Sequence, residues 1–111
     1  MDTDQLVGKR VHVRADELID VTIVAEIRAV EPDSSSLLLE FVPPAQIGTQ
    51  TYLFAVARPR LERDDLGTLL STGVLSCGVT CISQARYDPT RPFDLSWWRG
   101  GGAALADLVL Q

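Results

Sequence analysis

His12 is the first of the few side chains in this chain that have the chemistry for catalysis. It is the only histidine, so any nucleophilic triad with a histidine base must use it. His12 lies on the polar side of an alternating segment, 9–14, next to Arg14. The spacing indicates no carboxylate and no nucleophile beside it. We therefore interpret His12 as a surface residue of a strand.

The two cysteines, Cys77 and Cys81, form a C-x-x-x-C pattern rather than the C-x-x-C of redox and zinc sites. In a strand they would share one face and lie about 13 Å apart. That separation is too long for a disulfide or a shared metal ion, unless Gly78 introduces a bulge. Because reduced buried cysteines behave as small hydrophobic residues, we expect both in the core, with no metal site and no cofactor.

Glu26 and Glu40 are a possible pair of carboxylates facing each other across a hairpin. Paired carboxylates serve as acid and base in some hydrolases. However, Arg28 shares the face of Glu26, and opposite charges are common across exposed strands. We interpret the three side chains as a surface ion-pair group, so no catalytic residue is assigned.

The stretch RYDPTRPFDLSWWRGGG, residues 86–102, holds four of the seven aromatic residues of the chain. Two X-Pro steps favour an extended chain here, in which Trp97 and Trp98 point to opposite sides. Tryptophan and arginine are enriched where protein interfaces are strongest. Two interpretations stay open. The aromatic side chains anchor a long loop, or Arg91, Trp97, Trp98 and Arg99 form a contact surface in which Trp98 is exposed.

Hydrophobic patterns predict the strands that must position these residues. The predicted strands are 9–14, 19–30, 37–42, 51–58 and 74–83. The residues expected on one face of the second strand are Val21, Ile23, Ala25, Ile27 and Ala29. Segment 43–50, PPAQIGTQ, is predicted to be a loop, because its two prolines remove two donors from any strand pairing.

Segment 61–73 is predicted to contain one short helix. Its leucines fall at helical spacing, and Gly73 is well placed to end the helix. The acidic residues near its start suit a helix N-terminus, and they are Glu62, Asp64 and Asp65. The tail, 103–111, fits both a helix and a strand.

Composition and element order together predict the fold class. The chain of 111 residues is 46% hydrophobic and 23% charged, which is ordinary for a globular protein and suits a single domain over 1–111. Short connections between early strands favour an antiparallel meander. We expect an α+β, mostly β fold: a curved antiparallel sheet or a small SH3-like barrel, with one short helix before the last core strand.

Charge and hydropathy disfavour two classes of partner. The net charge of −5 disfavours nucleic acid, whose affinity depends on phosphate neutralisation. No window reaches the roughly 18 to 20 apolar residues of a membrane span. The acidic N-terminus has no apolar region of a secretory signal, so we expect a cytoplasmic protein. The sequence does not determine the oligomeric state.

The run 51–83 resembles part of a pattern in small immunity proteins of bacterial polymorphic-toxin systems. A strand with Tyr52 and Phe54 leads to Pro59 and Leu61, and a short acidic helix, a glycine and a hydrophobic strand follow. The resemblance implies a small, acidic, cytoplasmic and non-catalytic protein that binds and blocks a toxin. It assigns no binding residues.

Two hypotheses of function follow. The first is a non-catalytic protein-binding module of the immunity-protein kind, which contacts a protein partner through its aromatic loop and an acidic patch for a basic partner. The resemblance implies that this partner is a toxin. The contact residues of the module would be Arg91, Trp97, Trp98, Arg99, Glu62, Asp64 and Asp65. The alternative is a small-ligand-binding protein or minor enzyme, with a pocket between the sheet and the aromatic loop.

Overall fold

The protein is a closed barrel of six antiparallel strands. A computed structural model of the chain describes residues 3–15, 23–31, 36–47, 49–60, 66–82 and 103–111. The strands pair in chain order, and the last strand pairs back with the first. The predicted class, a mostly β α+β fold with a small antiparallel barrel and one short helix, is confirmed.

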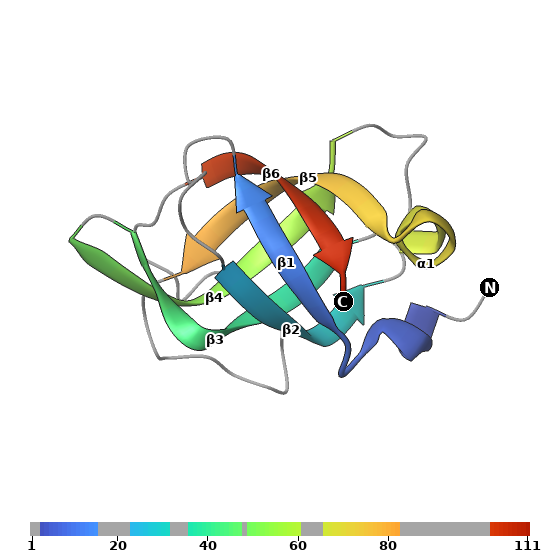
Figure 1. Cartoon of the computed structure of the whole chain (residues 1–111), viewed down its shortest axis with the longest axis horizontal. Coiled ribbons are helices and arrows are strands. Elements are labelled where there is room, and N and C mark those ends of the chain that lie inside the picture. The colour runs from blue at the N-terminus through green and yellow to red at the C-terminus, as the bar shows by residue number, and fades with distance from the viewer. Residues whose placement is uncertain (1–2, 16–22, 32–35, 48, 61–65, 83–102) are drawn as a thin grey trace.

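Six strands and two short helices make up the described part of the chain. The strands are β1 (Arg10–Ala15), β2 (Ile23–Glu31), β3 (Ser36–Ile47), β4 (Gln50–Pro59), β5 (Val74–Ile82) and β6 (Ala103–Leu110). A 3-10 helix, η1 (Thr3–Leu6), precedes β1, and α1 (Leu66–Thr72) joins β4 to β5. Figure 1 shows η1 and α1 at one end of the barrel, here called the helix end, and the β3–β4 turn at the opposite end, here called the hairpin end.

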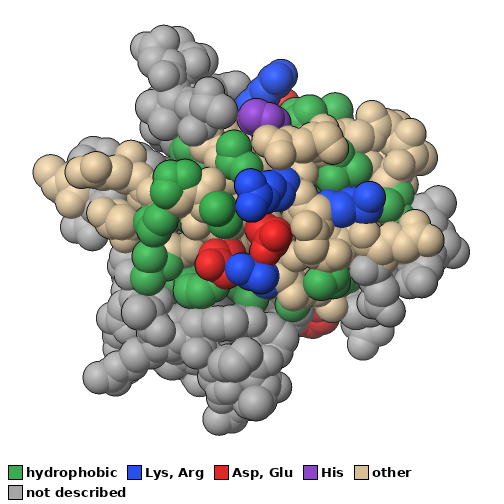
Figure 2. All heavy atoms as spheres, turned by 60° about the horizontal axis from the view of Figure 1, so that its bottom comes forward, with side chains coloured by type: hydrophobic (Ala, Val, Ile, Leu, Met, Phe, Trp, Pro, Cys, Tyr) green, Lys and Arg blue, Asp and Glu red, His purple; other side chains and the backbone are tan. Residues whose placement is uncertain are grey.

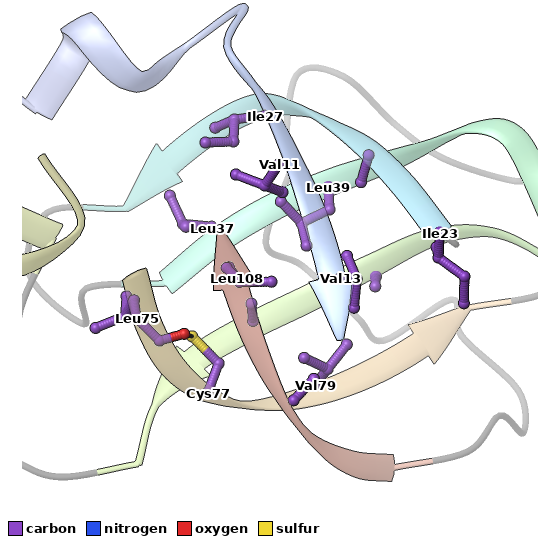
Figure 3. Packing of buried hydrophobic residues seen from close by; sticks show 14 of the residues in the cluster. Val11, Val13, Ile23, Ile27, Leu37, Leu39, Leu75, Cys77, Val79 and Leu108 are labelled. Carbon is purple, nitrogen blue, oxygen red and sulfur yellow. Dashed lines mark hydrogen bonds between the residues drawn. The ribbon is translucent and has the colours of Figure 1, made fainter. Parts of the chain in front are cut away.

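Alternating apolar side chains from all six strands form the core of the barrel (Figure 3). In β1, Val11 and Val13 point inward as the pattern predicts, and in β6 Leu108 does so. Leu6 of η1 and Leu69 of α1 are fully buried in the same core at the helix end. The short helices therefore cover one end of the barrel.

A β-bulge reverses the alternation in β2. Ile23, Ala25 and Ile27 are buried in the barrel core as predicted. The register with β3 then shifts between Ile27 and Ala29, so Val30 packs against the barrel core and Ala29 packs outside it. The prediction that Ala29 shares the face of Ile27 is wrong, because an extra residue in one strand exchanges the two faces.

Strand β3 continues through both prolines, so the predicted loop at 43–50 is also wrong. The pairing of β3 with β4 is interrupted between Glu40 and Ala45 and then resumes as far as Ile47 opposite Gln50. Within the described residues, β3 pairs with β2 only up to Phe41. The exposed prolines therefore occupy an irregular edge, where a missing N–H group is tolerated.

The helix prediction is confirmed, and the tail adopts the strand alternative. Gly73 has a φ of 79° and its N–H donates to the carbonyl of Leu69 at 2.9 Å, which closes α1. The tail forms β6, where Leu108 lies opposite Val13 on one side and Leu75 on the other. Because Leu108 is fully buried between β1 and β5, the strand closes the barrel.

Candidate functional site

All seven predicted contact residues lie outside the described residues. Arg91, Trp97, Trp98 and Arg99 belong to 83–102, here called the aromatic segment, and Glu62, Asp64 and Asp65 belong to 61–65, here called the acidic segment. The structure does describe the residues that flank each segment. Those flanking residues define where each segment joins the barrel.

The two ends of the aromatic segment are attached to neighbouring strands at the hairpin end. The segment follows Ile82, the last residue of β5, and precedes Ala103, the first residue of β6. These strands pair directly, with Thr80 opposite Ala103. Phe54 of β4 lies opposite Ile82. The barrel thus holds the ends of the segment next to each other on a paired frame, as binding loops are held on rigid scaffolds.

The acidic segment is attached to the opposite end. It connects Arg60, whose N–H donates to the carbonyl of Ser76 at 3.0 Å, with Leu66, the first residue of α1. Leu66 is buried in the core. The flanking residues of the two predicted contact groups therefore lie at opposite ends of the barrel (Figure 1).

A second apolar cluster lies on the outer face of β3, β4 and β5, next to the start of the aromatic segment. It consists of Leu38, Val56 and Ile82, with Ala29 and Phe54 packed against it. The first three are no more than 3% exposed. Sequence reasoning missed this outer cluster, although the run of leucines at 37–39 is typical of a strand that is buried on both faces.

His12 lies on the outer face of the barrel, as predicted. Its neighbours in register are Val24 of β2 and Val109 of β6. Its Nε2 lies 2.9 Å from Nε2 of Gln111. In the described part of the chain no carboxylate forms a hydrogen bond with His12, so the arrangement does not provide a catalytic triad there.

Cys77 and Cys81 are buried inside the barrel as thiols that form no disulfide, as predicted. Cys77 is fully buried, and its Sγ lies 3.7 Å from the carbonyl oxygen of Leu75. Burial raises the pKa of the Cys81 thiol above its ordinary value of 9.0, because the charged thiolate is poorly solvated there. A thiol kept neutral in this way is a poor nucleophile and a poor metal ligand.

The Glu26, Arg28 and Glu40 side chains form the ion-pair group that the sequence indicates. Glu26 and Glu40 are directly opposite each other in β2 and β3. Arg28 contacts both, at 2.8 Å from Glu26 and 2.6 Å from Glu40. Figure 2 shows acidic and basic side chains gathered together on one face. One guanidinium binds both carboxylates, so the group keeps a net charge of −1, and neither carboxylate is available as a separate acid or base.

Within the described residues, no group of three or more histidine, cysteine, aspartate or glutamate side chains is arranged to hold a metal ion. None of the helices described has the length and hydrophobicity that crossing a membrane requires. Comparison with protein-family models, with curated proteins and with solved structures found no match.

Proposed function

We propose that this protein is a non-catalytic protein-binding module that uses the aromatic segment to bind and block a protein partner in the cytoplasm. The observation that supports this proposal best is the attachment of the segment. Its flanking residues Ile82 and Ala103 belong to two directly paired strands of a closed barrel. A contact segment whose ends are held in place loses less conformational freedom on binding than a free one.

The residue types of the segment fit the energetics of a protein interface. Large aromatic side chains and arginine contribute most of the binding energy in typical interfaces. In this proposal Trp98 and Arg99 form the centre of the contact, and Trp97 and Arg91 surround it. The immunity-protein resemblance of 51–83 is consistent with the same proposal, and a toxin is the corresponding partner.

The acidic segment has a different role in the proposal, because its flanking residues belong to the other end of the barrel. Charges outside the centre of an interface act mainly on the rate of association. The chain carries a net charge of −5, so it attracts a basic partner over a distance. Glu62, Asp64 and Asp65 strengthen that attraction near α1.

The composition of the core limits where the barrel could bind a small ligand. Small-ligand sites usually combine an apolar wall with a few polar groups that orient the ligand. The described residues that form the barrel core are all apolar or cysteine. That set therefore offers a ligand no orienting group inside the barrel, and the small-ligand alternative needs its pocket between the sheet and the aromatic segment.

The test is capture of the partner from a lysate of the encoding organism, followed by affinity measurements with the purified pair. We expect Trp98→Ala to weaken binding by about 30-fold or more, as for a central interface residue. Val7→Ala is the matched control, because Val7 is an exposed hydrophobic residue outside both segments (48% exposed). Equal affinity of the wild type and Trp98→Ala would refute the assignment of the aromatic segment.

A second measurement separates the two segments. The triple variant Glu62→Gln, Asp64→Asn and Asp65→Asn should slow association and reduce its salt dependence, with little change in the dissociation rate.

For the ligand alternative, a thermal-shift screen against metabolites is the direct check, since a ligand that binds only the native state raises Tm.

A further inference from the structure

The outer face of β1 carries basic side chains that the proposed function does not use. They are Arg10, His12 and Arg14, here called the basic row, and they alternate with the buried residues Val11 and Val13. Both arginines are exposed, and Figure 2 shows Lys and Arg side chains on the same face as the histidine. β1 contains no acidic residue, although the whole chain has a net charge of −5. The strand therefore places positive charge along one line on the surface of an acidic protein.

Arg10 lies opposite a carboxylate that another arginine binds. The residue opposite Arg10 in β2 is Glu26, and its Oε2 lies 2.8 Å from Nη1 of Arg28. Arg10 itself takes part in none of the ion pairs among the described residues. Opposite charges across neighbouring strands commonly pair with each other. Because Glu26 has its partner elsewhere, the guanidinium N–H groups of Arg10 remain available to a ligand.

Arg14, at the other end of the row, has a similar environment. Asp107 lies opposite it in β6, but the carboxylate of Asp107 accepts a hydrogen bond from the Ser76 hydroxyl at 2.7 Å. Among the described residues Arg14 forms no ion pair either. His12, between the two arginines, has a valine opposite it on each side. The row thus has an available cation at each end and a largely apolar middle.

The length of the row determines which ligand fits it. The Cα atoms of residues four apart in a strand are separated by about 13 Å, so a compact anion such as phosphate reaches only one arginine. An extended peptide has the same repeat as β1. Acidic side chains at positions i and i+4 of such a peptide therefore lie over the two arginines, and the side chain at i+2 lies over His12 and its valine neighbours. Each guanidinium can then bind one carboxylate through two parallel hydrogen bonds.

We propose that the basic row binds an extended segment of a partner protein with acidic side chains at positions i and i+4 and an apolar side chain at i+2. Charge complementarity at the two ends and apolar contact in the middle give the row its selectivity. The row belongs to neither the aromatic segment nor the acidic segment. Its test is therefore independent of the proposed function.

A peptide fits the row better than a nucleic acid, because acidic side chains flank the row. Glu26 and Glu40 lie on one side of it, in β2 and β3, and Asp107 lies on the other, in β6. A nucleic acid carries a negative charge at every phosphate, so these carboxylates and the net charge of −5 repel it. An extended peptide of the proposed pattern carries charge only at the positions that face the arginines.

An NMR titration of the isotope-labelled full chain tests the proposal, because it measures weak binding and also locates it. The probe is a peptide with ETVTE at its centre, and the matched control peptide has QTVTQ instead. We expect the ETVTE peptide to shift the amide signals of β1 and its neighbours most, and to bind at least about tenfold more tightly than the control peptide. High salt should weaken this binding, because it screens exposed charges.

Three variants of the chain separate recognition by the row from a general attraction. Arg10→Gln with Arg14→Gln should weaken binding of the ETVTE peptide at least about tenfold, with Tm unchanged because both side chains are exposed. Arg10→Lys with Arg14→Lys keeps the charge but loses the paired hydrogen bonds, so its affinity should be intermediate. Arg58→Gln is the matched control, because Arg58 is an exposed arginine of β4 outside the row, and it should bind like the wild type.

The proposal makes exclusions that the same titrations check. A wild type that binds the two peptides equally, or a double glutamine variant that binds as well as the wild type, would overturn it. An equal loss of affinity in Arg58→Gln would do so too, because the attraction would then be general. Displacement of the peptide by a short single-stranded oligonucleotide at a similar concentration would assign the row to nucleic acid instead.

Discussion

Leu38 is buried on the outer face of the barrel, although its neighbours Leu37 and Leu39 are buried on the inner face. Adjacent side chains in a strand point to opposite faces, so both faces of β3 are apolar at this point. Leu38 is 1% exposed. The outer cluster therefore belongs to the packed structure of the protein.

Replacing Leu38 by alanine should lower the free energy of unfolding by about 2–5 kcal/mol, the usual cost of removing a buried leucine side chain. Urea denaturation measures it. Val7→Ala, at an exposed position, should change stability by no more than about 0.5 kcal/mol. A cost for Leu38→Ala as small as that of the control would contradict the burial of the outer cluster.

Cys81 gives the stability of the protein a dependence on alkaline pH. Burial raises the pKa of its thiol above 9.0 in the folded state, whereas the unfolded thiol ionises near its ordinary value. The folded state therefore keeps a proton that the unfolded state releases. The stabilisation is complete below 9.0 and is lost as the pH rises through the folded-state pKa.

We expect the wild type to lose more stability than Cys81→Ala between about pH 7 and about pH 10. Urea unfolding of both proteins at the two pH values gives the difference, in which the titration of other groups cancels. Identical losses in the two proteins would show that Cys81 ionises normally in the folded state.

At the scale of the elements, patterns of period two predicted most strands, and the errors occur where a strand becomes irregular. β1 and β5 follow simple alternation over most of their length, whereas in β4 Tyr52 packs against the barrel core and Phe54 packs against the outer cluster. Simple alternation fails at the bulge after Ile27 in β2 and at the interruption between Glu40 and Ala45 in β3. Whether a bulge forms depends on the partner strand, which the local sequence does not specify.

Gly73 and Gly78 show that the same residue type has different roles in two elements. Gly73 ends α1 with a φ of 79°, which side chains with a Cβ disfavour. Gly73→Ala should therefore destabilise the protein by about 1 kcal/mol or more. Gly78→Ala in β5, which has open space above it and no positive φ, should be neutral or slightly stabilising. Thermal unfolding at low protein concentration compares the two, and a larger loss for Gly78→Ala would contradict these roles.

At the scale of the whole molecule, closure of the barrel is the feature that local patterns did not determine. It depends on the pairing of β1 with β6, in which Val11 lies opposite Leu110, and on the burial of Leu108 between β1 and β5. Residues so far apart in the sequence carry no local signal of their contact. For this reason the local pattern of 103–111 fits both a helix and a strand, and its pairing with β1 and β5 decides for the strand.

The candidate site was predicted from residue types alone, and the seven contact residues remain predictions. The barrel adds the positions at which the aromatic and acidic segments begin and end, at opposite ends of the molecule. It also adds the outer apolar cluster next to Ile82. Neither could be inferred from 61–65 or 83–102, because both depend on how the six strands close.

The central claim is that the aromatic segment presents a tryptophan for contact, and tryptophan fluorescence with acrylamide quenching tests it most directly. Both tryptophans of the chain belong to this segment, so Trp97→Phe and Trp98→Phe each leave a single reporter. The account predicts that Trp98, observed in Trp97→Phe, has red-shifted emission in the native protein and is readily quenched. Blue-shifted and protected emission from both single-tryptophan variants would contradict it, because the two side chains would then be anchors packed within the protein.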